Sequence, residues 1–104
     1  MASLYFRRGM VLGMRGNLDG ARKEFLAALD AASRETDINA QHEVIVVSHD
    51  ALGVLAQTAG DYREALRWFR MAEEEQARFG GRWVGDISTK RKRMEELAAK
   101  SGAP

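Results

Sequence analysis

The chain has 104 residues, with 16 basic against 15 acidic side chains and a formal net charge of +1. This length fits a single domain, and the balanced charge excludes a general electrostatic attraction to nucleic acid or to an anionic membrane. The absence of cysteine excludes disulfides and thiolate metal sites. No apolar run approaches the roughly 20 residues that span a bilayer, and the N-terminus lacks a signal-peptide pattern. We therefore expect a cytoplasmic protein without membrane contact.

The distribution of glycine and of apolar residues predicts an all-α chain. Its one proline is Pro104, so no internal position is forced to break a helix. Gly16 and Gly60 each follow an apolar run, where a helix commonly ends in a left-handed residue. Between such stops, apolar side chains recur every three or four residues, which is the period of an amphipathic helix. In chain order, we expect about five helices, over residues 2–14, 18–34, 38–58, 62–79 and 86–100.

Polar residues at four of the predicted helix starts can accept a hydrogen bond from the first turn. These N-cap residues are Asn17, Asp37, Asp61 and Asp86. One patch, residues 45–47, is β-branched and strand-like in composition. Because Leu52 and Leu55 continue the helical spacing beyond this patch, we interpret it as part of a buried helix.

The sequence repeats itself at a fixed offset of 44 residues. Small and aromatic residues make up the repeated set, in which Gly9, Gly16, Ala21, Phe25 and Ala28 recur as Gly53, Gly60, Ala65, Phe69 and Ala72. A repeat of this kind indicates structural units that stack on one another. Stacked units usually present binding surfaces rather than catalytic pockets.

As a helix-turn-helix unit, each half of the repeat resembles the tetratricopeptide repeat. Residues 16–18 (Gly-Asn-Leu) and 60–62 (Gly-Asp-Tyr) stand at the turn of that family. The resemblance implies that glycine lets two helices approach closely, alanine makes room opposite and phenylalanine fills the gap to the next unit. The repeat-packing residues are Gly9, Ala21 and Phe25 in the first unit and Gly53, Ala65 and Phe69 in the second.

The period of this chain is 44 residues, whereas that of the tetratricopeptide repeat family is about 34 residues. The family's closing proline is also absent, and we place the extra residues between Ser33 and Glu43. We expect one α-solenoid domain of two antiparallel helix-turn-helix repeats, at about 2–35 and 38–79. A C-terminal helix at about 86–100 then caps the open end, because a solenoid of two units leaves an apolar face uncovered.

In the family that the chain resembles, the first helices of the repeats line a concave groove for a peptide or a partner helix. The corresponding residues here are Phe6, Met10, Met14, Val47, Asp50, Val54 and Gln57. Gly13 and Thr58 lie on the same predicted faces. Methionine and phenylalanine make an adaptable apolar surface. We therefore expect a protein-binding module whose partner is a protein or peptide.

Two other occupants of this groove stay open. A second copy of the chain would make the protein a self-associating scaffold or homodimer, and the C-terminal helix would make the groove part of the core. A different alternative is a regulator fragment that contacts nucleic acid through the basic run 90–93. Because Glu95 and Glu96 follow this run, we expect a solvated helix face there and disfavour nucleic acid.

The sequence offers no catalytic, metal or cofactor site. His42 and His49 are seven residues apart, or about 10 Å along one helix, which is too far for one metal ion without other ligands. The acidic run 73–75 has the spacing of a solvated helix face, and no glycine-rich phosphate loop follows a strand. No nucleophile with a neighbouring base is visible, so we expect a protein that is not an enzyme.

Overall fold

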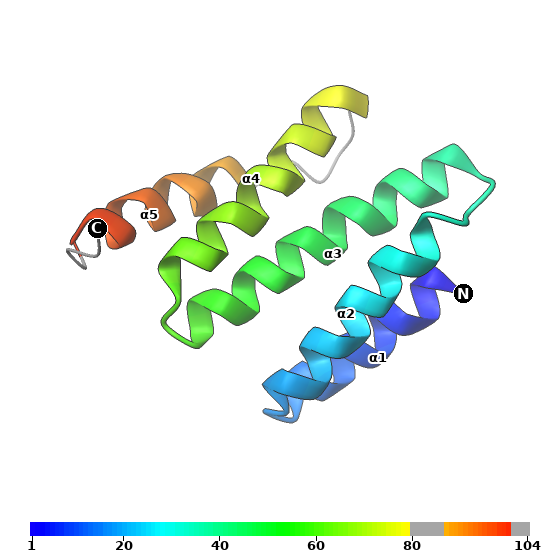
Figure 1. Cartoon of the computed structure of the whole chain (residues 1–104), viewed down its shortest axis with the longest axis horizontal. Helices are drawn as coiled ribbons and strands as arrows, with labels where there is room; N and C mark the ends of the chain where they lie inside the picture. Colours follow the sequence, from blue (N-terminus) through cyan, green and yellow to red (C-terminus); the bar gives the residue numbers. More distant parts are fainter. Residues whose placement is uncertain (80–86, 101–104) are drawn as a thin grey trace.

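A computed structural model describes residues 1–79 and 87–100 of the chain. This part contains five α-helices and no strand, so the predicted all-α fold is confirmed. The helices are α1 (Ala2–Met14), α2 (Leu18–Ala32), α3 (Ile38–Thr58), α4 (Tyr62–Phe79) and α5 (Ile87–Lys100). Successive helices lie side by side, from the α1–α2 pair at one end of the molecule to α5 at the other (Figure 1).

The predicted helix ends are confirmed at most positions, with one correction in α2. This helix ends at Ala32 rather than at residue 34. The Ser33 hydroxyl donates to the Asp30 carbonyl at 2.6 Å, and the Arg34 amide donates to the carbonyl three residues earlier, Ala31. These three-residue bonds tighten the last turn and end the regular helix.

Three of the four predicted N-caps accept the expected hydrogen bonds. Asn17 accepts from the Gly20 amide at 2.9 Å, and Asp61 accepts from the Glu64 amide at 3.1 Å. Asp37 accepts from two backbone amides at the start of α3. The fourth predicted cap, Asp86, lies outside the described residues. Each bond satisfies a helix donor that has no partner within its own helix.

Both predicted left-handed glycines are confirmed by their backbone. Gly16 has a φ of 82° and Gly60 a φ of 83°, a conformation that costs other residues free energy. The chain reverses at these two positions and returns as the second helix of each pair.

Within each pair, a phenylalanine ring lies directly on the glycine, where alanine was expected. A Cβ atom added to Gly9 would stand 2.6 Å from the Phe25 ring, and one added to Gly53 would stand 2.5 Å from the Phe69 ring. Real Cβ atoms do not come this close to a ring carbon. Glycine therefore sets the distance between α1 and α2 and between α3 and α4.

The same rings also contact the next helix along the chain. Phe25 packs with Ala21 and with Leu52 of α3, and Phe69 packs with Ala65 and with Met94 of α5. All of these side chains are buried. The two phenylalanines thus join each pair internally and bind it to the helix that follows.

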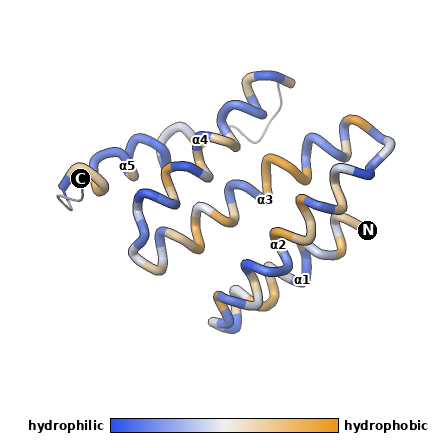
Figure 2. Tube along the Cα trace, in the orientation of Figure 1, coloured by the Kyte–Doolittle hydropathy of each residue, from blue (hydrophilic) through white to orange (hydrophobic). Residues whose placement is uncertain are grey.

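The strand-like patch 45–47 is helical, as predicted, and lies inside α3. Val46 is fully buried against Ala72 and Ile87, in a cluster shared by three helices. Helix α3 shows more of the apolar colour than α4 and α5, whose tubes are largely hydrophilic (Figure 2). This difference fits the central place of α3, which contacts helices on both sides.

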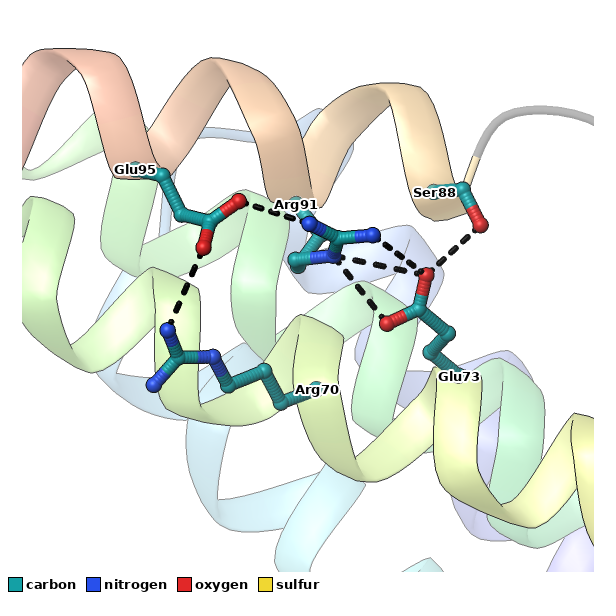
Figure 3. A network of polar contacts seen from close by, with 5 residues as sticks. All are labelled: Arg70, Glu73, Ser88, Arg91 and Glu95. Atoms are coloured by element: carbon teal, nitrogen blue, oxygen red, sulfur yellow. Dashed lines mark hydrogen bonds and ion pairs between the residues drawn. The ribbon is translucent and has the colours of Figure 1, made fainter.

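Polar side chains join α4 to α5 in one network (Figure 3). Arg91 donates through Nε to Glu73 at 3.1 Å and through Nη1 to Glu95 at 2.6 Å. Ser88 donates to the same Glu73 at 2.6 Å, and Arg70 reaches Glu95 at 3.3 Å. The hydrogen bonds from Ser88 and Arg91 hold the pKa of Glu73 below its ordinary value.

This network corrects the expectation that residues 90–93 form a solvated face. Lys90 and Arg91 turn inward, toward Asp50 of α3 and Glu73 of α4, whereas Lys92 and Arg93 are exposed. The predicted solvated face at residues 73–75 is corrected for the same reason. Only Glu74 of that run is exposed, because its neighbours face helices that supply basic partners.

Candidate protein-binding groove

A groove of about 460 Å³ runs along α1 and α3. Its walls and floor are built from thirteen residues, which are almost all apolar or small. They are Phe6, Gly9, Met10, Gly13, Met14, Leu18, Phe25, Val47, Asp50, Ala51, Val54, Leu55 and Thr58. This volume lies within the roughly 300–1,000 Å³ typical of pockets that take ligands.

The structure brings together most of the residues that the sequence proposed for this groove. Phe6, Met10 and Met14 line it from α1, and Val47, Asp50 and Val54 line it from α3. Gly13 and Thr58 also lie in its wall. Gln57 does not line the groove, although it is exposed. Helical spacing alone groups Gln57 with Asp50 and Val54, so its place outside the lining depends on how α1 and α3 pack and not on its spacing along α3.

Sequence reasoning missed the floor of the groove. Leu18 was assigned to a turn and Leu55 to the helix interior, yet both line the groove together with Phe25. The Phe25 ring lies 5.4 Å from the Phe6 ring, centroid to centroid, in a tilted arrangement. The 44-residue repeat had marked Phe25 as a packing residue. Its ring therefore serves the helix pair and the groove together.

The methionines on the α1 side of the groove are open to solvent. Met14 is 83% exposed and Met10 is 45% exposed, while Phe6 beside them is partly covered. Exposed apolar side chains that adjoin a groove are more informative than single ones scattered over a surface. Burial of these side chains by a partner would be favourable, at about 25 cal/mol for each Å² of apolar surface removed from water.

The one carboxylate in the groove is held by an ion pair. Asp50 receives two bonds from Lys90 Nζ, at 2.9 and 3.1 Å. Lys90 lies on α5, so this ion pair joins α5 to α3 at Asp50. Because the lysine neutralises the carboxylate, the groove presents an apolar surface without a free negative charge.

The two histidines of α3 face α4 rather than the groove. His49 stacks on Trp68 with ring centroids 5.6 Å apart. Burial lowers the pKa of His49, and the Glu75 carboxylate opposes part of this shift. His42 has its Nδ1 atom 3.4 Å from the same Glu75. Across residues 1–79 and 87–100, no three side chains of the types that bind metals gather into a possible site.

The fold and the groove define a class of protein: an α-helical repeat protein with a largely apolar groove. A family model described as the tetratricopeptide repeat matches residues 1–74, so the chain belongs to the tetratricopeptide repeat family. This family generally mediates protein–protein interaction, and its repeats are typically non-enzymatic. The searches of curated proteins and of solved structures gave no match. Among the helices described here, none has the length and apolar character needed to cross a membrane.

Proposed function

We propose that the protein is an interaction module and that its groove binds the apolar face of an amphipathic helix from a partner protein. The observation that carries this proposal is the open, largely apolar groove between α1 and α3. A helix fits the site because its apolar side chains recur every three or four residues. The groove walls have the same spacing, through Phe6, Met10 and Met14 on one side and Val47 and Val54 on the other.

The chemistry of the walls supports an apolar partner face. Asp50 is neutralised by Lys90, so a partner residue that enters the groove meets no unpaired carboxylate. Methionine side chains adapt their shape to different partners. A charged partner side chain would lose its hydration in the groove without gaining an ion pair, which is unfavourable.

The proposal includes a division of the chain into two repeats and a cap. In this reading, residues of about 2–35 and 38–79 are the repeats, and α5 is the capping helix. Met94 and Ile87 of α5 are buried against the α3–α4 pair. Their burial supports the capping role, because they cover an apolar face that would otherwise meet water.

Two alternatives have less support. Self-association would use the same methionines, and it makes the protein a scaffold or a homodimer. Contact with nucleic acid would use the basic run of α5, but Lys90 and Arg91 are already held by Asp50, Glu73 and Glu95. Trp83, whose ring could stack on a base near this run, lies outside the described residues.

The test compares Met10→Glu with Met71→Glu. Met71 lies on α4 and is 44% exposed, against 45% for Met10, so the two variants add the same charge at equal exposure. Light scattering across about a tenfold concentration range first gives the mass of each protein. A dimer that Met10→Glu abolishes and Met71→Glu retains supports self-association in the groove and contradicts the proposal.

The second step measures binding to a defined probe. The probe is a fluorescein-labelled peptide of about 18 residues, with leucine every three or four positions and glutamine elsewhere. We expect fluorescence anisotropy to show binding to the wild type and to Met71→Glu, with affinity about tenfold lower for Met10→Glu. Equal binding by all three proteins, or by none, would contradict a role for the groove.

A further inference from the structure

A second surface lies on the solvent-exposed side of α1 and borders α2 at Glu24. This outer α1 face consists of Leu4, Arg7, Arg8 and Val11, which share one side of the helix by their spacing. Leu4 is 44% exposed and Val11 is 46% exposed, and both arginines are exposed as well. Of the helices described in the structure, none covers this face.

The internal repeat shows what covers the equivalent face of α3. The equivalent positions, 44 residues later, of Leu4, Arg8 and Val11 are Ser48, Leu52 and Leu55. Ser48 and Leu52 are fully buried, and Leu52 and Leu55 pack against the α2 residues Ala21 and Phe25. The second repeat therefore holds a helix on the face that the first repeat leaves open.

The chemistry of the outer α1 face differs from that of its counterpart in α3. Arg8 stands where the second repeat has the buried Leu52, and α1 contains no acidic residue. Within the described part of the chain, neither Arg7 nor Arg8 forms an ion pair, whereas basic residues of α2, α4 and α5 do. A helix that covers this face must therefore offer carboxylates to the two guanidinium groups.

A hollow of about 400 Å³ adjoins these arginines. It is lined by Arg7, Arg8, Val11, Leu12 and Glu24. Glu24 is the one acidic residue there, so its single charge leaves the lining net positive. The apolar parts of Val11 and Leu12 give the hollow a floor on which an apolar side chain can rest, next to the charged groups.

We propose that the outer α1 face is a docking surface for an amphipathic helix of a partner protein that carries acidic side chains beside an apolar stripe. The partner helix would lie on α1 as α2 lies on α3. A second copy of α1 is a poor occupant, because it would bring arginines against arginines, and like charges at close range repel. This surface is separate from the groove between α1 and α3.

The test uses two fluorescein-labelled peptides of about 18 residues with the same leucine stripe. Glutamate flanks the stripe in one peptide, and lysine flanks it in the other. Binding to the full chain is measured by fluorescence anisotropy. We expect the glutamate peptide to bind about tenfold or more tightly than the lysine peptide. We also expect its affinity to fall as salt is raised to about 0.5 M, because salt screens exposed charges.

Three variants locate the binding surface. Arg8→Glu should weaken binding of the glutamate peptide about tenfold. Arg67→Glu changes the net charge equally at an exposed position of α4, and it should leave the affinity near that of the wild type. Met14→Glu, in the groove, should leave the preference for the glutamate peptide over the lysine peptide near its wild-type value. Circular dichroism should show an unchanged helical content for all three proteins, since the replaced side chains are exposed.

Several outcomes would overturn this inference. No binding of the glutamate peptide, or equal binding of both peptides, would contradict the preference of this face for acidic side chains. An equal loss in Arg8→Glu and Arg67→Glu would mean that the peptide senses only overall charge. A loss of the preference for glutamate in Met14→Glu alone would place the preferred site in the groove. A wild-type dimer that Arg8→Glu dissociates would assign the face to a second copy. Failure of the groove proposal would leave the inference intact, because the two surfaces are tested by different variants.

Discussion

Replacement of Gly53 by alanine should destabilise the protein, although alanine favours helices more than glycine does. The added Cβ would lie 2.5, 2.7 and 2.8 Å from three carbon atoms of the Phe69 ring. Carbon atoms in ordinary contact are about 3.5–4.0 Å apart, so the ring would have to move by about 1 Å. The ring is fully buried among Ala56, Ala65 and Met94, so its movement would displace these side chains.

The size of the effect follows from two opposing contributions. Overpacking a core by one methyl group costs about 1–3 kcal/mol. The higher helix propensity of alanine offsets up to about 1 kcal/mol of this cost. With a mid-range overpacking cost of about 2 kcal/mol, we expect Gly53→Ala to lower the free energy of unfolding by about 1 kcal/mol, which corresponds to about 4–8 °C in melting temperature for a domain of this size. Replacement by leucine, with a larger side chain, should unfold the domain.

Gly13 provides the matched control. A Cβ at Gly13 would meet only the Ala21 Cβ, at 3.9 Å, which is an ordinary contact. Gly13→Ala should therefore raise the free energy of unfolding, by about 0.5 kcal/mol. Thermal unfolding followed by far-UV circular dichroism measures both variants. An unchanged or raised melting temperature for Gly53→Ala would refute the argument, because it would mean that the Phe69 ring yields without cost.

Three further predictions concern polar groups. The pKa of His49 is lowered by burial. As pH falls, His49 therefore binds a proton in the unfolded chain before it does so in the folded chain. Stability should be full above the ordinary pKa of about 6.5 and should decline below it, and His49→Gln should flatten this part of a plot of melting temperature against pH. Arg91→Met should lower the melting temperature and speed hydrogen exchange in α5, because it removes the bonds to Glu73 and Glu95; unchanged exchange in α5 would contradict the role given to this network. Asp37→Ala removes the two bonds at the start of α3 and should cost about 1 kcal/mol in chemical denaturation, whereas Asp37→Asn should retain most of the stability.

The network around Glu73 has a pH dependence of its own. Hydrogen bonds from Ser88 and Arg91 lower the pKa of Glu73, so the folded state favours its carboxylate. The contribution to stability is present above the ordinary pKa of 4.5 and is lost as pH falls through the lowered value. The acid loss from Glu73 therefore begins at a lower pH than the loss from His49. Glu73→Gln should remove the lower part of the acid transition and leave the upper part in place.

The amino-acid sequence by itself determined the helices, their caps and the repeat, because these depend on residues close together along the chain. Gly16 and Gly60 end helices through their own backbone freedom, and Asn17 and Asp37 bind amides two or three residues away. The 44-residue offset also matched Gly9 with Gly53 and Phe25 with Phe69 as equivalent residues, whereas the contact of each ring with its glycine came only from the structure. Six of the seven residues proposed for the groove line it for the same reason, since helical spacing places them on one face.

Only the tertiary structure decided which polar groups meet and what forms the floor of the groove. Lys90 reaches Asp50, and Arg91 reaches Glu73, across helices that are far apart in sequence. The basic run alone gives no sign of these partners. Leu18 and Leu55 come together under the groove because α2 and α3 pack through Phe25. Helical spacing specifies the direction in which a side chain points around the axis of its helix. The angle and distance between two helices instead depend on how the buried side chains of both helices fit together.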